Sequence, residues 1–256
     1  MLINTVILFL RDALPIFILM GMLLAQLPLT ARQLILSIGV GLLCTWWFTG
    51  QIDPLSQWFD GSGVELVFWL LHLSIYLLVS ALGLAMLKPL NWRPDWLAIS
   101  LIVVIFVAKG SNFWLYFSGY WHQQTALQSM TVGTLLGLGI CLSLATLLYF
   151  FIQWLSRRWG ALYAWLVLLI FASGQLTQAL NLLVQVDWLP AASPVWNSQW
   201  LVDNESEYGH LLNVLLGYIA TPTLMQLLVY ASAILLPLAL LWQGIFLTPS
   251  SRGKHP

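Results

Sequence analysis

The chain has 256 residues, of which 60% are hydrophobic and only 7% are charged, and its net charge is zero. Soluble domains carry about a quarter charged residues, so this composition excludes a water-soluble protein. It predicts an all-α integral membrane protein, with the lipid bilayer as its main partner and no nucleic acid.

Seven apolar segments follow one another along the chain, and each is about long enough to cross a bilayer core. They cover residues 2–27, 33–49, 64–87, 97–117, 132–155, 160–184 and 218–247. The first segment does not fit a cleavable signal, because no basic residue precedes it and its charges, Arg11 and Asp12, lie in its middle. The sequence therefore predicts seven transmembrane helices.

The charges outside these segments predict the orientation of the chain. With the N-terminus outside the cytoplasm, the inner side holds Arg32, Lys88, Arg93, Arg157, Arg158, Arg252 and Lys254. The outer side then holds Asp53, Asp60, Glu65, Asp187, Asp203, Glu205 and Glu207. Cytoplasmic loops carry an excess of Lys and Arg, so we expect the C-terminus inside the cytoplasm.

Three charges fall inside the predicted helices. Arg11 and Asp12 lie near the bilayer midplane, and Lys109 lies about as deep in the fourth segment. Adjacent helical residues point about 100° apart, so Arg11 and Asp12 are each expected to need a partner elsewhere. Lys109 either extends toward the outer interface or pairs with Asp12 across helices; we favour the pair, because a lone buried carboxylate is the costlier alternative. Pro15 has no backbone N–H and leaves a carbonyl near Arg11 without its donor.

The two halves of the chain carry a weak internal similarity. A shift of 97 residues lays residues 7–12 over residues 104–109, and three helices separate the copies. The copies would run in opposite directions, as in transporters built from inverted repeats. We expect a first three-helix repeat in 1–95, a second in 96–184, an outer acidic loop in 185–217, a seventh helix in 218–247 and a cytoplasmic tail in 248–256.

Four stretches, which cover residues 9–21, 106–116, 172–190 and 209–222, resemble the high-affinity iron permeases, the ferroxidase-coupled transporters of fungi and bacteria. The resemblance implies seven helices in the orientation above, a bacterial inner membrane and a periplasmic or membrane-bound redox or iron-binding partner. That family carries an Arg-Glu-x-x-Glu motif in its first and fourth helices. In the first motif Arg11 is kept, and Asp12 and Pro15 stand at the two Glu positions. In the second motif Ala108 stands at the Arg position, Lys109 and Asn112 stand at the two Glu positions, and Gly110 is kept between them.

These substitutions change the net charge of the two motif positions compared with the iron permeases. Arg11, Asp12 and Lys109 sum to +1, whereas two full motifs would sum to −2. Ferric iron prefers several oxygen anions, and only one carboxylate lies at this depth.

Other candidate metal ligands lie nearer the outer side. Glu65 and His72 are seven residues apart and share one helix face, so with Asp12 they could line a replacement path for a cation. The alternative for His72 is a hydrogen-bonded structural role. Asp203, Glu205 and Glu207 could collect cations at an entrance, or they could form a solvated acidic stretch.

The leading hypothesis is a permease that moves iron, or a related metal cation, into the cytoplasm. It predicts no enzyme activity and no tightly bound cofactor, with iron as substrate. The alternative is a homologue that does not transport and serves as an assembly subunit or regulator, its path closed by an Asp12–Lys109 salt bridge. A third hypothesis, a different and anionic solute, follows from the +1 midplane.

Overall fold

The computed structural model describes residues 2–87, 94–120, 124–204 and 206–246, and for some residues at helix ends only the backbone. The described residues form helices and one isolated bridge, between Pro194 and Thr223. Seven helices are long and apolar enough to cross a membrane, which confirms the all-α membrane fold class. They are α1 (Leu2–Gln26), α2 (Ala31–Thr49), α4 (Gly63–Leu87), α5 (Pro94–Tyr120), α6 (Gln124–Trp159), α7 (Ala161–Gln185) and α9 (Leu224–Phe246).

Local sequence signals set several helix ends. Thr30 caps α2: its hydroxyl accepts the backbone N–H of Gln33, and the Gln33 side chain accepts the backbone N–H of Thr30. Gly160 is the single residue between α6 and α7, with φ of 106°, a conformation that glycine adopts without strain. Both connections are therefore short, and the one at Gly160 leaves α6 and α7 in contact with each other.

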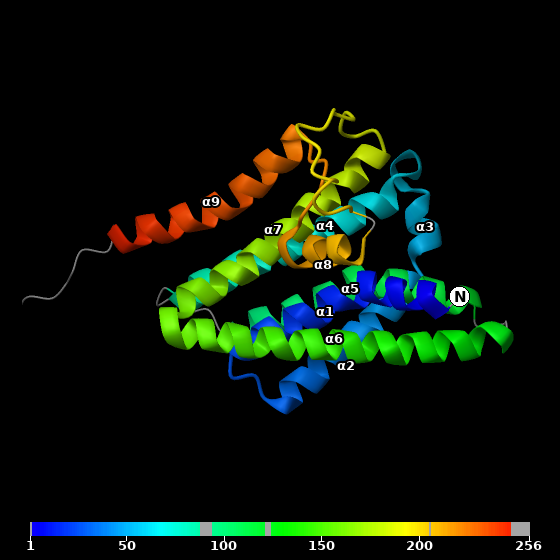
Figure 1. Cartoon of the computed structure of the whole chain (residues 1–256), viewed down its shortest axis with the longest axis horizontal. Coiled ribbons are helices and arrows are strands. Elements are labelled where there is room, and N and C mark those ends of the chain that lie inside the picture. The colour runs from blue at the N-terminus through cyan, green and yellow to red at the C-terminus, as the bar shows by residue number, and fades with distance from the viewer. Residues whose placement is uncertain (1, 88–93, 121–123, 205, 247–256) are drawn as a thin grey trace, which may run out of the picture.

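The helices pack in three main pairs (Figure 1). α1 packs most extensively on α6, α2 on α5 and α4 on α7, while α5 also contacts α1 and α4. α1 and α7 are the most enclosed spans, and α2, α6 and α9 face outward. Buried Trp165 links α7 to α4: its indole N–H donates to the Val79 carbonyl over 3.1 Å, and its ring fills the space beside Gly83. Side chains of α1, α4, α5 and α7 supply most of the core.

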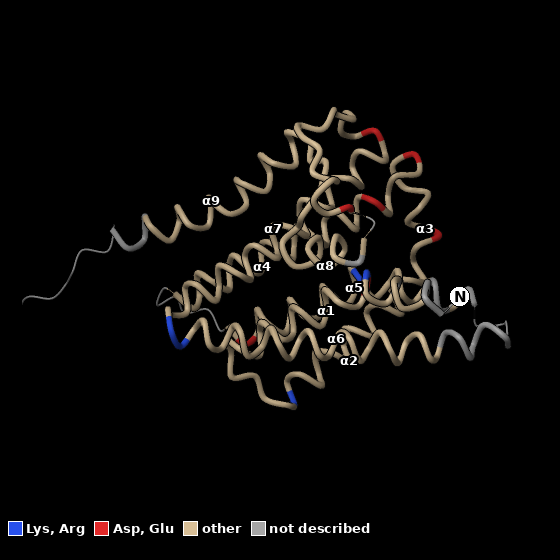
Figure 2. The backbone as a smooth tube through the Cα atoms, in the orientation of Figure 1, with Lys and Arg blue, Asp and Glu red and all other residues tan. Residues whose placement is uncertain are grey.

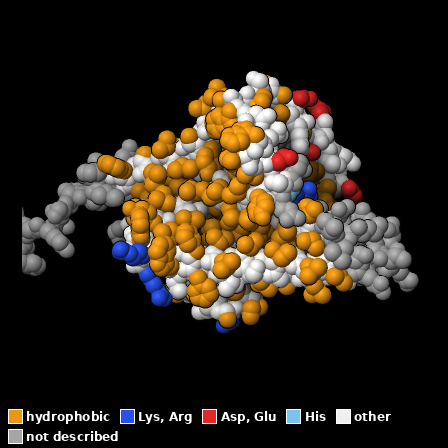
Figure 3. Space-filling view, in the orientation of Figure 1, with side chains coloured by type: hydrophobic (Ala, Val, Ile, Leu, Met, Phe, Trp, Pro, Cys, Tyr) orange, Lys and Arg blue, Asp and Glu red, His pale blue; other side chains and the backbone are white. Residues whose placement is uncertain are grey.

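Charges separate to opposite ends of the molecule (Figure 2). The described basic residues outside the core, Arg32, Arg157 and Arg158, lie at one end, and most acids lie at the other. Asp95, in the first turn of α5, is an acid at the basic end. Between the ends, the visible face is a broad band of hydrophobic side chains (Figure 3). Such a band is the surface that a bilayer covers.

Three short helices complete the chain. α3 (Ile52–Ser56) and η1 (Trp58–Gly61) connect α2 to α4, and α8 (Glu207–Leu216) precedes α9. The predicted outer loop therefore contains a helix. The predicted start of the seventh helix at residue 218 is wrong, since residues 218–223 are not helical and α9 begins at Leu224.

α8 and the turn after it reach the middle of the membrane-spanning bundle. α8 contacts α7 and α1, and it ends at Gly217 with φ of 70°. A Cβ on Gly174 would lie 2.6 Å from the Gly217 Cα, so the two backbones touch. Gly174 is one residue from Ser173, the centre of α7. The C-terminal end of α8 thus lies beside the middle of α7. Because the chain enters the bundle along α8 and turns back after Gly217, α8 is a re-entrant helix.

The chain then returns to the acidic end in an extended conformation. The Ala220 carbonyl accepts the backbone N–H of Ser198, and the Pro222 carbonyl accepts that of Val195, both over 2.9 Å. The Ala220 N–H donates to the side-chain oxygen of Asn204. Non-helical backbone at membrane depth is stable only when its polar groups are satisfied or reach water, and these bonds satisfy several of them.

Candidate functional site

A polar cavity of about 390 Å³ lies where α1, α5, α7 and α8 meet. Its volume falls in the range of small-molecule sites, roughly 300–1,000 Å³. Nine of the eleven lining side chains are polar or charged. They are Arg11, Asp12, Lys109, Asn112, Gln178, Asn181, Asn204, His210 and Asn213, with Val214 and Ile219 as the apolar pair.

The cavity extends from the bundle centre to the acidic end. Asp12 is two residues from Leu14, the centre of α1, and Lys109 is two residues from Val107, the centre of α5. Two residues correspond to about 3 Å of helix, so both charges lie close to the middle of their helices. Asn204, in the connection that carries Asp187 and Asp203, lines the same cavity. Charged residues at such depth normally face a polar cavity, as these do.

Arg11 and Asp12 pair with each other. The Arg11 Nε and Nη2 atoms donate to the two carboxylate oxygens of Asp12 over 3.3 and 3.2 Å. The Asp12 side chain is 5% exposed and the Arg11 side chain 57%. The prediction that each of these neighbours needs a partner elsewhere is wrong, because the long Arg11 side chain folds back toward Asp12 although the two Cβ atoms diverge.

Lys109 has no ion pair among the described residues, and the predicted Asp12–Lys109 salt bridge is not formed. Its ammonium group lies in the same cavity as Arg11 and Asp12 and interacts electrostatically with both. Figure 2 shows the basic positions of α1 and α5 side by side in the bundle. The cavity thus contains one neutralised pair and one additional cation.

Amide side chains hold the cavity wall together. Gln178 donates to the Asn213 carbonyl over 2.8 Å, and the Asn213 side chain donates to the Tyr218 carbonyl over 2.8 Å. Asn181 accepts a hydrogen bond from Gln226 over 2.7 Å. These bonds fasten the re-entrant segment and α9 to α7. The side chains of Gln178, Asn181 and Asn213 each still have a second polar atom that bonds to nothing else in the described part of the chain.

The predicted metal ligands do not come together. Among residues 2–87, 94–120, 124–204 and 206–246, no group of three or more His, Cys, Asp or Glu side chains could hold a metal ion. His72 is buried and its Nδ1 bonds to the Phe68 carbonyl over 2.7 Å, as in the structural alternative. One Glu65 oxygen is buried without a protein partner in that part of the chain, away from the cavity lining.

The acidic run before α8 lies partly outside the described residues. Asp203 is exposed and does not line the cavity. Glu205 and the side chain of Glu207 lie outside the described part. The prediction that these acids collect cations therefore stays a prediction.

The remaining motif positions have distinct surroundings. Asn112 lines the cavity as a neighbour of Lys109 on α5. Gly110 faces Thr45 of α2 at ordinary contact distance, so it does not line the cavity. Pro15 lies inside α1, where the Arg11 carbonyl receives no intrahelical N–H from it.

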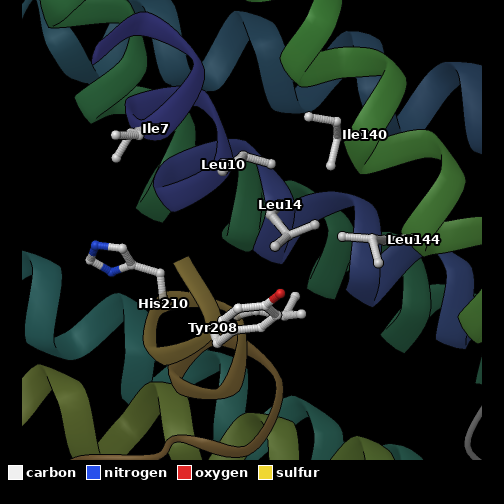
Figure 4. A pocket seen from close by; sticks show the side chains of 8 residues that line it. Ile7, Leu10, Leu14, Ile140, Leu144, Tyr208 and His210 are labelled. Atoms are coloured by element: carbon white, nitrogen blue, oxygen red, sulfur yellow. The ribbon is translucent and has the colours of Figure 1, made fainter. Parts of the chain in front are cut away.

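A second, apolar pocket of about 210 Å³ adjoins the cavity (Figure 4). α1, α6 and α8 form it: Leu10 and Leu14 face Ile140 and Leu144 across the opening, and Tyr208 lies beneath them. His210 lines both this pocket and the polar cavity. Its imidazole therefore stands at the boundary between an apolar and a polar compartment.

Sequence reasoning missed the amide half of the cavity. Gln178 and Asn181 are three residues apart in α7, which places them on one face. That spacing was an available signal for an inward polar face. Asn204 and Asn213 had no comparable signal, because the re-entrant path of α8 brings them to the site.

Comparison with models of known protein families found no match, and no curated protein or solved structure matches the chain. The resemblance to iron permeases stays a prediction from the residues that carry it. Chemically, the site offers a paired carboxylate, several amides and the Lys109 ammonium group, which has no ion pair among the described residues.

Proposed function

We propose that this chain is a solute permease of the bacterial inner membrane, in which the polar cavity is the solute site. The observation that carries the proposal is the cavity itself: nine polar or charged side chains converge near the centres of membrane-spanning helices. Intramembrane charges are costly, about 2.5–3.5 kcal/mol each on insertion scales, and are typical of solute pathways. A re-entrant helix beside the cavity is a further feature of transporters.

The helix pairing supports an arrangement of two inverted three-helix repeats plus α9. In this arrangement α1 corresponds to α5, α2 to α6 and α4 to α7. The counterpart of the α1–α6 pair is then the α5–α2 pair. Both are among the most extensive packing pairs, and α4–α7 is its own counterpart. The first helix of each repeat supplies a cavity charge, and solute sites form at such repeat interfaces.

The charge distribution supports a periplasmic N-terminus and a cytoplasmic C-terminus. The basic end then faces the cytoplasm and the cavity opens toward the periplasm. The non-transporting alternative required an Asp12–Lys109 bridge, which is not formed. A redox or binding partner on the periplasmic side remains part of the iron-permease hypothesis alone.

Accessibility of the cavity from the two membrane faces tests the proposal without knowledge of the solute. Asn112 lines the cavity and is exposed to it, so an Asn112→Cys variant with Cys44 and Cys141 replaced by Ala carries one reporter thiol. In a permease the site opens alternately to each side. We therefore expect a membrane-impermeant maleimide to label the variant in both right-side-out and inside-out vesicles.

Two variants in the same cysteine-free background calibrate the sidedness. Asp203→Cys, at the acidic end, should label from the periplasmic side, and Arg157→Cys, at the basic end, from the cytoplasmic side. Labelling of Asn112→Cys from the periplasmic side alone would contradict the proposal, because a cavity closed permanently on one side cannot transport.

A further inference from the structure

We propose that the solute is a small oxyanion, bound through a carboxylate, phosphate or sulfate group, with the Lys109 ammonium as its counter-ion. The inference rests on the proposed function only in that the bound anion is a transported solute. Binding of the anion is argued from the residues of the cavity alone. It departs from the metal cation that the family resemblance implies.

The first argument is the charge of the cavity. Arg11 and Asp12 neutralise each other at 3.2 Å, and Lys109 has no ion pair in the described chain. The net charge of the three is +1. A cation near the middle of a membrane is stabilised by an opposite charge or by water. An anionic solute supplies the missing opposite charge.

The second argument is the set of hydrogen-bond donors. The Asn181 oxygen is engaged by Gln226 and the Asn204 oxygen by the Ala220 N–H. Both side-chain NH₂ groups are therefore left without a protein acceptor among the described residues, and both residues line the cavity. Oxyanions accept several hydrogen bonds, and bonds to a charged acceptor are about twice as strong as neutral ones. Lys109 thus acts together with amide donors at the cavity wall.

The third argument excludes a bare metal cation as the preferred ligand. Hard cations require several oxygen ligands, usually with more than one carboxylate. Asp12 is the single carboxylate in the lining, and Arg11 occupies both of its oxygens. Lys109 would repel a cation from the remaining side-chain amide oxygens, those of Asn112, Gln178 and Asn213.

Binding measurements on the full chain in lipid nanodiscs test the proposal, with sulfate, phosphate and acetate as anion probes and Fe²⁺ as the cation probe. We expect at least one anion to bind the native protein, and Lys109→Met to weaken its Kd at least tenfold. Lys109→Arg keeps the charge and should stay within about threefold of native. Arg32→Met, which removes a charge from the exposed basic end, should leave the Kd unchanged.

The outcomes separate this inference from the proposed function. In one outcome, an anion binds and Lys109→Met weakens the binding, but Asn112→Cys is labelled from one side only. This outcome would support the anion site and overturn the permease. Labelling from both sides, with no binding by any of the three anions, would support the permease and overturn the anion site. Binding of Fe²⁺ that tightens in Lys109→Met would also overturn it. Size-exclusion profiles check that each variant remains folded.

Discussion

At the residue scale, the Arg11–Asp12 pair is asymmetric in its contact with solvent. The carboxylate is almost fully buried, whereas more than half of the Arg11 side chain is exposed, so the guanidinium keeps access to water in the cavity. Loss of the guanidinium leaves a buried charge without compensation. Loss of the carboxylate leaves a cation that water can still solvate. The two partners should therefore differ in what their removal costs.

We expect Arg11→Gln to lower the free energy of unfolding by about 1.5–3 kcal/mol, the range for a lost hydrogen bond to a charged group. Asp12→Asn should cost less, and the double variant should recover most of the loss of Arg11→Gln. Thermal melting in detergent measures all three. Additive losses in the double variant would show that the two side chains are not coupled.

At the element scale, α8 depends on one backbone contact. Gly174 and Gly217 touch through their main chains, and the amide bonds of Gln178 and Asn213 add to this contact from the cavity side. A real Cβ essentially never lies closer than 3.0 Å to another heavy atom, so even one methyl group on Gly174 would require the backbone of Gly217 to move. The cavity wall would move with it.

We expect Gly174→Ala to release the re-entrant segment and to speed backbone amide hydrogen exchange in residues 207–223, because local opening of α8 costs less free energy. Gly139→Ala is the matched control: it adds the same methyl group inside a membrane helix, and nothing lies within 4 Å of its Cβ. Equal exchange rates in the two variants would mean that the Gly174–Gly217 contact does not hold α8.

At the scale of the whole molecule, hydropathy was sufficient for the seven spans and insufficient for the site. Each span is a long apolar run, and a helix satisfies all of its backbone hydrogen bonds within that run. α8 has only ten residues, too few to be recognised as a span, and the signal for the start of α9 was the pair Thr223 and Gln226, which cap the helix, and not hydropathy. The charges at Asp12 and Lys109 could be placed by depth, but their partners depended on side-chain conformations and on the position of α8.

The orientation of the whole chain depends on the charge difference between its ends. Lys and Arg in short loops set topology, whereas acids contribute little. Replacing Arg32, Arg157 and Arg158 by Gln removes three of the seven basic residues that the sequence places on the inner side. We expect part of the population to insert in reverse. A Gln57→Cys reporter, exposed between α3 and η1 at the acidic end, would then become partly inaccessible to an impermeant thiol reagent in intact cells.

Removing the acids Asp53, Asp60 and Asp187 instead should leave the labelling unchanged. If Gln57→Cys in the otherwise native chain were inaccessible in intact cells, the acidic end would face the cytoplasm, and the proposed orientation would be wrong.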